Sequence, residues 1–307
     1  MGSNSKNPVI SVVIGSYNRY KFLKETIKSV RENGIEVPYE IIVIDGGSTD
    51  GTIPWLIKQK DVITIVQHNR GEFMGKKIER RSWGYFMNIA FRSTHGKYIL
   101  MISDDCLLVP GAVMNGYNLF EEKLSEGEKI GGAAFYWRNW PEDKKYFVIA
   151  VNGQIYINHG MYLKDALEEV DYINEEDYMF YCADVDLSLR LVKAGYSIEA
   201  IEESTVEHYN HANYQVRKSN RERYQQDDLH FKSNWMDFLG PNPNSSIIKS
   251  EIIPNDKIAN KSFNSFYRRR KIMRFFCMNL SLLYHFCETK LLVFINNSIS
   301  INLKRLK

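Results

Sequence analysis

The sequence predicts an α/β fold in which a mixed, mostly parallel sheet is flanked by helices, with a C-terminal helical extension. Residues 9–14 are rich in β-branched side chains, a polar turn follows from Gly15, and apolar residues then recur at helical spacing over 22–30. The unit repeats at once, with a strand at 40–44, a polar turn and a helix at 52–58. Strands that alternate with helices predict parallel pairing with right-handed crossovers.

The composition is that of an ordinary globular protein, with 44% hydrophobic and 25% charged residues in a chain of 307. The 40 basic and 37 acidic side chains give a net charge of +3, which is too balanced to indicate nucleic acid as the main partner. The first six residues are polar and lack the apolar core of a signal peptide, so we expect a cytoplasmic protein. Four widely separated cysteines show no zinc-site spacing and favour a reducing compartment: Cys106, Cys182, Cys277 and Cys287.

A basic segment follows the third expected strand, which covers residues 62–66. It spans 68–81 and precedes an apolar helix at 83–91. Taken singly, its cations are explained as solvated loop residues. As a group they are suited to a diphosphate, because several positive charges beside a metal site attract phosphate oxygens. They are Arg70, Lys76, Lys77, Arg80 and Arg81.

The central stretch of the chain is an apolar strand at 98–102 that ends in Ser103, Asp104 and Asp105. A buried strand cannot bury two carboxylates without partners. At the carboxyl end of a parallel strand, where open sheets place their ligands, such a pair suits a hard cation such as Mg²⁺ or Mn²⁺. The alternative is a simple turn before Pro110, because Ser and Asp favour turns.

A second concentration of carboxylates covers residues 175–186. It follows a helix at 110–124, a strand at 131–137 and an aromatic region with short strands at 146–150 and 154–157. Asp184 lies at the start of a helix that ends at Gly195. The helix dipole favours its ionised form and the neighbouring acids oppose it, and a helix cap explains the residue equally well.

The last third of the chain divides the protein into two expected parts, a domain at 1–240 and a linker with a helical segment at 241–307. Short strands at 196–200 and 204–206 lead to His208, and a helix is expected at 214–238. An arginine-rich cluster opens the segment 268–303, which we expect to be an amphipathic helix at an anionic membrane surface. Packing on the main domain or on a dimer partner is the alternative.

Four motifs together resemble the family 2 glycosyltransferases of the GT-A (Rossmann-like) fold. They are VISVVIGSYNR, IIVIDGGSTDGT, GKYILMISDD and ADVDLSLRLVKAGY, in family order over roughly the first three quarters of the chain. The family often has a second aspartate where this chain has Gly46, and a glutamate where it has Ala183.

The resemblance implies roles for particular residues. Gly15, Tyr17 and Asp45 are expected to hold the nucleotide, and Asp104 to face the ribose or a metal-bound water. Asp105 is the implied metal ligand, His208 a further metal or diphosphate contact, and Asp184 the general base. Lys77 and Arg80 of the basic segment complete the expected nucleotide-sugar-binding residues.

The implied reaction is the inverting transfer of a sugar from a nucleotide-diphosphate donor to a hydroxyl, because a carboxylate that only accepts a proton leads to displacement in one step. Mg²⁺ or Mn²⁺ would neutralise the leaving diphosphate. Expected partners are a UDP- or dTDP-sugar, a glycan or lipid-linked glycan acceptor in surface polysaccharide or glycolipid synthesis, the inner membrane surface and a second copy of the chain.

Two other functions remain open from the sequence. A sugar-1-phosphate nucleotidyltransferase has similar strand and helix units, but it usually needs a glycine-rich basic loop after the first strand, where this chain has a single glycine, Gly15. A non-catalytic sugar-binding protein is supported by Gly46 and Ala183. The presence of Asp104, Asp105 and Asp184 together argues against it.

Overall fold

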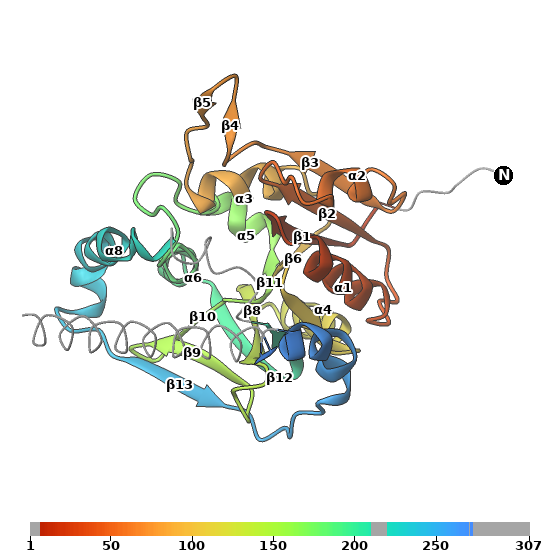
Figure 1. Cartoon of the computed structure of the whole chain (residues 1–307). Helices are drawn as coiled ribbons and strands as arrows, with labels where there is room; N and C mark the ends of the chain where they lie inside the picture. Colours follow the sequence, from red (N-terminus) through yellow and green to blue (C-terminus); the bar gives the residue numbers. More distant parts are fainter. Residues whose placement is uncertain (1–6, 210–219, 270, 273–307) are drawn as a thin grey trace, which may run out of the picture. The chain divides into compact units, whose positions relative to one another are not determined.

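The computed structural model describes residues 7–209, 220–269 and 271–272 (Figure 1). The chain forms two compact units, Met1–Asn255 and Asp256–Lys307. In the second unit residues 257–269 are helical. The segment 268–303, expected at a membrane surface, lies outside the described residues except for 268, 269, 271 and 272. None of the helices in the described part of the chain is long and apolar enough to cross a membrane.

The N-terminal half contains the predicted parallel strands. β1 pairs with β2 on one side and with β6 on the other, and β3 follows β2 at the edge. This confirms the parallel sheet expected from the alternation of strands and helices. The strands are β1 (Ile10–Ser16), β2 (Tyr39–Asp45), β3 (Val62–Val66) and β6 (Tyr98–Ser103), and the helices between them are α1 (Tyr20–Arg31), α2 (Thr52–Leu56) and α3 (Trp83–Arg92).

The second half makes the sheet mixed. β11 lies antiparallel between β6 and β8, while β12 runs parallel to β8 and antiparallel to β7. The elements here are β7 (Cys106–Leu108), α4 (Ala112–Ser125), β8 (Ile130–Asn139), β9 (Phe147–Val151), β10 (Gln154–Tyr156), β11 (Gly160–Leu163), α5 (Lys164–Glu169), α6 (Ala183–Lys193) and β12 (Ser197–His208). Sequence analysis did not predict β7, β11 or α5, because three to six residues are too few to show a hydrophobic period.

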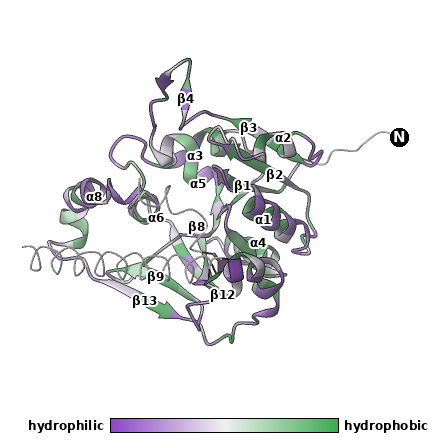
Figure 2. Ribbon diagram, in the orientation of Figure 1, coloured by the Kyte–Doolittle hydropathy of each residue, from purple (hydrophilic) through white to green (hydrophobic). Residues whose placement is uncertain are grey.

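The central strands form the core. Every residue of β11 is buried, and β1 and β6 are buried at all but one position each. Helices α1, α3, α4 and α6 pack against strands of the sheet. Because central strands are covered on both faces, they have continuous apolar runs instead of alternation. Figure 2 shows hydrophobic residues on these strands and hydrophilic stretches on α1 and α8.

Strand β12 is continuous, where the sequence predicted two short strands. A shift in its register with β8 between Ile201 and Thr205 accommodates the polar residues that separated the two predictions. The end of β12 places His208 opposite both Cys106 of β7 and Asn139 of β8. One strand therefore brings His208 to the end of β6.

The segment from residue 241 differs from the expected linker. After α8 (Tyr224–Leu239), β13 (Ser245–Lys249) pairs antiparallel with β9 and extends the sheet. All five of its residues are exposed, as is common for an edge strand, so it has no apolar alternation that would identify it in the sequence.

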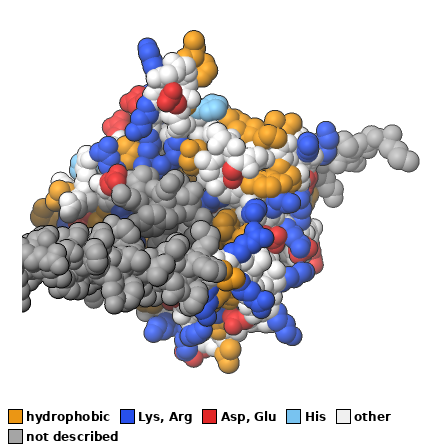
Figure 3. All heavy atoms as spheres, in the orientation of Figure 1, with side chains coloured by type: hydrophobic (Ala, Val, Ile, Leu, Met, Phe, Trp, Pro, Cys, Tyr) orange, Lys and Arg blue, Asp and Glu red, His pale blue; other side chains and the backbone are white. Residues whose placement is uncertain are grey.

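A small hairpin projects from the basic segment. β4 (Glu72–Phe73) and β5 (Lys76–Lys77) are joined by Met74 and Gly75, which both have positive φ. Phe73 and Met74 are 70% and 86% exposed, and hydrophobic side chains are visible at the top of the molecule in Figure 3, where this hairpin lies. Lys77 is exposed on the same hairpin.

Candidate active site

The candidate site lies where the parallel strands β1 and β6 end side by side. Gly15 is paired with Ser103, so the turns after both strands start at the same edge of the sheet. The chain leaves β1 toward β2 on one side, while β6 lies on the other, and such a reversal of strand order opens a crevice at the carboxyl ends.

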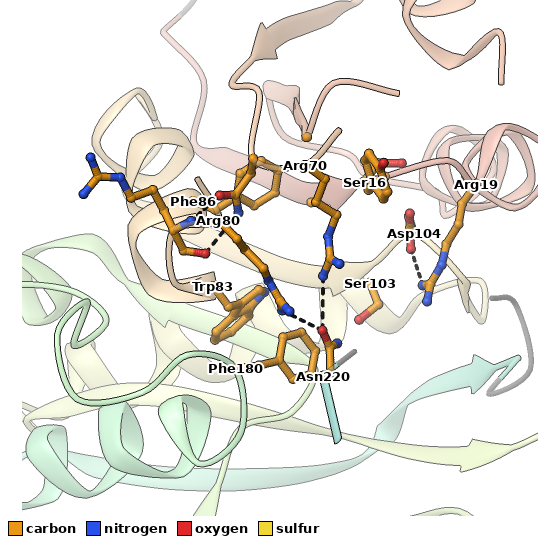
Figure 4. A pocket seen from close by; sticks show the side chains of 15 residues that line it. Ser16, Arg19, Arg70, Arg80, Trp83, Phe86, Ser103, Asp104, Phe180 and Asn220 are labelled. Atoms are coloured by element: carbon orange, nitrogen blue, oxygen red, sulfur yellow. Dashed lines mark hydrogen bonds and ion pairs between the residues drawn. The ribbon is translucent and has the colours of Figure 1, made fainter. Parts of the chain in front are cut away.

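A cavity of about 740 Å³, counting space open to solvent, occupies this crevice (Figure 4). Gly15 and Gly46 line its sheet side. A Cβ on Gly15 would lie 2.8 Å from Sδ of Met87, so a side chain at this position would displace Met87. The other lining residues are mainly arginines, aromatic side chains and small polar groups: Ser16, Tyr17, Arg19, Asn69, Arg70, Arg80, Arg81, Trp83, Phe86, Ser103, Asp104, Phe180 and Asn220.

Two guanidinium groups converge in this cavity. Arg70 and Arg80 both donate to Oδ1 of Asn220, over 3.1 and 2.6 Å (Figure 4). The guanidinium of Arg70 also lies 5.5 Å from the centre of the Tyr17 ring. Burial, with Arg70 and Arg223, lowers the pKa of Arg80 to about 10, so the residue remains charged at neutral pH. The cavity therefore offers positive charge beside aromatic rings.

Asp104 and Asp105 are buried, and one arginine compensates both. Nη1 of Arg19 lies 2.7 Å from Oδ1 of Asp104 and 2.8 Å from Oδ2 of Asp105. Burial raises the pKa of Asp104 more than Arg19 lowers it. Burial also opposes ionisation of Asp105, but Arg19 and His208 outweigh it and hold its pKa below the usual range. The paired carboxylates are thus unequal, and Asp105 is the one kept ionised.

The second oxygen of Asp105 faces the imidazole of His208. Oδ1 of Asp105 has no hydrogen-bond partner among the described residues and lies 3.5 Å from Nε2 of His208. These two residues and Cys106 present ligand atoms within 4.8 Å of one another. Burial raises the pKa of Cys106 well above its usual value, so its thiol stays protonated. The carboxylate and the imidazole are therefore the groups that fit a divalent cation.

Asp184 lies in the first turn of α6. Its Oδ1 accepts from the backbone N–H of Val185 at 3.0 Å, and its Oδ2 from Nδ2 of Asn158 at 2.6 Å. Burial raises the pKa of Asp184, and these hydrogen bonds only partly oppose the shift. The first residue of the motif, Ala183, follows Cys182, which has a positive φ of 65°.

The dipeptide Asn158-His159 links the two acidic centres. Asn158 binds Asp184, while the next residue, His159, has its Nε2 3.7 Å from Sγ of Cys106 and its ring centre 5.7 Å from that of His208. Burial lowers the pKa of His159 to about 3, so its imidazole is neutral. Asp184 and the surroundings of Asp105 are therefore joined through one short segment.

The other predicted residues fall into two groups. Gly15, Tyr17, Arg80 and Asp104 line the cavity. Asp45 does not, because its buried carboxylate accepts from Gly47 N, Ser48 N and Ser48 Oγ and so shapes the turn after β2. Lys77, exposed on the hairpin, is not a lining residue either.

Several residues of the site were not predicted. Arg19 was part of a quoted motif but had no assigned role, and its charge next to the turn after β1 was the available signal. No sequence pattern marks Asn158, His159 or Asn220, which reach the site only through the fold. Trp83 lies in the expected apolar helix and Phe180 in the carboxylate-rich segment, and neither had a predicted role at the site.

Comparisons with known proteins show which sequences and folds this chain resembles. Residues 11–146 match the sequence model of the family described as glycosyl transferase family 2. An uncharacterised glycosyltransferase of Bacillus subtilis, YfnE, is 26% identical over 155 residues, which are 47% of this chain and 36% of that protein. Chondroitin synthase of Escherichia coli is 30% identical over 118 residues, 38% of this chain and 16% of that protein. The chain thus spans well under half the length of either relative.

Among solved structures, a mannosyltransferase from Pyrobaculum calidifontis in complex with GDP-Man and Mn²⁺ is similar. It has 13% sequence identity and a TM-score of 0.51, over 84% of this chain and 70% of that one. At this identity the likeness concerns the fold, which is the GT-A fold expected from the sequence.

Proposed function

Since the chain belongs to the family 2 glycosyltransferases, we propose that it transfers a sugar from a nucleotide-diphosphate donor to a hydroxyl acceptor, with inversion at the anomeric carbon. One observation carries the proposal. A single cavity at the strand-order reversal combines arginines, aromatic rings and the buried carboxylate of Asp104.

The cavity suits each part of a nucleotide-sugar donor. Tyr17 and Trp83 offer ring faces for stacking on a base, and Arg70 and Arg80 offer charged donors for phosphate oxygens. The relative from Pyrobaculum binds GDP-Man. Here we propose a UDP- or dTDP-sugar, bound by Gly15, Tyr17, Arg80 and Asp104.

Asp105 and His208 are the residues that would hold Mg²⁺ or Mn²⁺. Oδ1 of Asp105 and Nε2 of His208 lie 3.5 Å apart, a separation at which both atoms can bind one ion. Two ligand atoms about 2.1 Å from the same ion lie at most about 4.2 Å apart. When bound, the ion neutralises charge on the leaving diphosphate. Arg19 keeps Asp105 ionised and oriented, since it holds the opposite carboxylate oxygen.

Asp184 is the proposed general base. Its raised pKa makes it a stronger proton acceptor than an exposed aspartate, and Val185 and Asn158 fix the direction of the carboxylate. It accepts the proton of the attacking hydroxyl and forms no bond to the sugar, so the displacement is a single inverting step.

The acceptor we propose is a glycan or a lipid-linked glycan in polysaccharide synthesis, with the protein in the cytoplasm or at the inner membrane surface. The segment that would contact the membrane, 268–303, lies almost wholly outside the described residues. We also propose that the chain forms homo-oligomers, with this segment as the alternative dimer contact.

The test is a panel of UDP-, dTDP- and GDP-sugars with Mn²⁺. A donor at 100 times its Kd is expected to stabilise the fold by about 2.7 kcal/mol and raise the melting temperature. The stabilising donor should then release its sugar to water or to a glycan, and Asp105→Asn should abolish both effects. Pyrophosphate release from a sugar phosphate and a nucleoside triphosphate would instead identify a nucleotidyltransferase. Donor binding with no release would identify a non-catalytic sugar-binding protein.

A further inference from the structure

We propose that Asn139 and Asp143 are positioning residues that fix the tautomer of His208, so that its Nε2 lone pair faces Asp105 and can bind a cation. The inference rests on the proposed function, because it concerns the metal site assigned there. It adds two residues to which sequence analysis assigned no role.

The first step is the placement of His208. Asn139 ends β8 beside His208 at the end of β12, and the two residues are register partners. Nδ1 of His208 lies 3.0 Å from Oδ1 of Asn139, and the backbone N–H of Trp140 donates to the carbonyl of His208 at 2.9 Å. One residue earlier, Arg138 makes a two-bond ion pair with Glu207, over 2.8 and 2.9 Å, which secures the same two strands.

The second step is the polarity of the Asn139 amide. Its Nδ2 donates to Oδ2 of Asp143 at 2.8 Å, and its backbone N–H donates to the same oxygen at 2.9 Å. An ionised carboxylate only accepts hydrogen bonds, so the amide nitrogen must face Asp143 and the amide oxygen must face His208. The reversed amide would place two acceptors against each other.

The third step follows for the imidazole. Because Oδ1 of Asn139 only accepts, Nδ1 of His208 must carry the proton, and neutral His208 then has its lone pair on Nε2. That lone pair lies 3.5 Å from Oδ1 of Asp105, an oxygen without a hydrogen-bond partner among the described residues. Without an ion, the proton that Nε2 carries in the imidazolium faces this carboxylate. A cation bound between the two atoms takes the place of that proton, because Nδ1 keeps its own. Outer groups that fix a histidine in this way typically change metal affinity 10- to 100-fold when removed.

A spectroscopic test needs no metal. In ¹⁵N NMR spectra of the metal-free protein, neutral His208 is expected as the Nδ1–H tautomer. Asn139→Ala should move the population toward the Nε2–H form, because the acceptor on Nδ1 is lost. An unchanged tautomer in Asn139→Ala would overturn the inference.

A binding test uses Mn²⁺ alone, followed by electron paramagnetic resonance. Asn139→Ala should weaken Mn²⁺ binding about 10- to 100-fold. The double variant Asn139→Asp/Asp143→Asn should recover most of it, since the new carboxylate can accept from Nδ1 and the new amide can donate to it. Asn115→Ala on helix α4 is the matched control. It removes the hydrogen bond that the side-chain amide of Asn115 donates to the carbonyl of Glu203 at 3.1 Å. A melting curve of each variant shows whether it is folded.

Two further variants separate this inference from the proposed function. Asp105→Asn and His208→Ala should both weaken Mn²⁺ binding, and unchanged binding in both would reject the metal site itself. Weaker binding in these two together with native binding in Asn139→Ala would reject only the positioning role.

Discussion

The two acidic centres of this protein consist of the same residue type in opposite surroundings. At the end of β6, Asp104 and Asp105 share the cation of Arg19, and the pKa of Asp105 is held low although it is buried. At the start of α6, Asp184 receives hydrogen bonds from two neutral groups, and burial raises its pKa. The surroundings of the first centre therefore favour an ionised carboxylate at Asp105, and those of the second raise the proton affinity of Asp184.

This difference accounts for the proposed division of roles. A carboxylate that remains ionised inside the protein is a ligand for cations, whereas one with a raised pKa is a better base at neutral pH. Substitutions at each acidic centre test this difference, and the largest effect is expected at Asp184.

Replacing Asp184 by Asn should reduce transfer about 10²- to 10⁴-fold, because the acceptor hydroxyl loses its proposed general base. Donor affinity, measured by calorimetry, should be nearly unchanged. The control is Asp186→Asn two residues further on, whose carboxylate binds Arg190 and Trp235 at 2.8 and 2.9 Å. That variant should lose stability and keep its turnover. A comparable loss of donor affinity in Asp184→Asn would show that Asp184 is structural.

Replacing Arg19 by Met should destabilise the protein by about 3 kcal/mol in urea unfolding, because two buried carboxylates lose their cation. The matched control is Arg31→Met at the end of α1, the helix that begins directly after Arg19. Its ion pair with Asp61 is partly exposed and should contribute under about 1 kcal/mol. Equal effects of the two variants would contradict the view that Arg19 compensates the acidic pair.

The basic segment provides a smaller contrast between Arg80 in the cavity and Lys77 on the hairpin. Arg80→Gln should weaken donor binding about 10- to 100-fold, since a hydrogen bond to a charged group contributes about 1.5–3 kcal/mol. Lys77→Gln should change it less than about 2-fold. A larger effect of Lys77→Gln would restore the role that the sequence predicted for it.

The smallest effect concerns stability against pH in metal-free buffer. A raised pKa means that Asp184 contributes fully below its unfolded pKa of about 3.9, and that the contribution is lost as the pH rises through the folded pKa. Asp184→Asn should therefore be at least as stable as the native protein at pH 7. The lowered pKa of Asp105 gives the opposite sign, with stability present above about pH 3.9 and lost as the pH falls. Urea unfolding between pH 2 and 8 checks both, and equal signs would contradict the comparison.

The sequence predicted the parallel half of the fold well because its strands and helices are long enough to show their periods. It also predicted Asp104 and Asp105 as site residues, since two carboxylates at the end of an apolar run are visible without the fold. β11 has only four residues and could not be recognised in this way. β13 was hidden for a different reason, because an exposed edge strand lacks apolar alternation.

The partners of the acidic residues could not be predicted, because they are distant in the chain. Arg19 meets Asp104 across 85 positions, and His208 reaches Asp105 only because β12 pairs with β7. Asp45 differs, because its hydrogen-bond partners are close to it in the chain. The resemblance implied a nucleotide contact, but neighbouring backbone groups already satisfy its carboxylate.

The position of β11 has a consequence for dissecting this protein. This strand occurs after residue 159 in the chain yet sits in the middle of the sheet, between β6 and β8. A fragment cut at residue 146, where the family match ends, would leave β6 with an open edge and would lack Asn158, His159, Asp184 and His208. Such a fragment should aggregate, and the shortest autonomous version of the protein must run through β12.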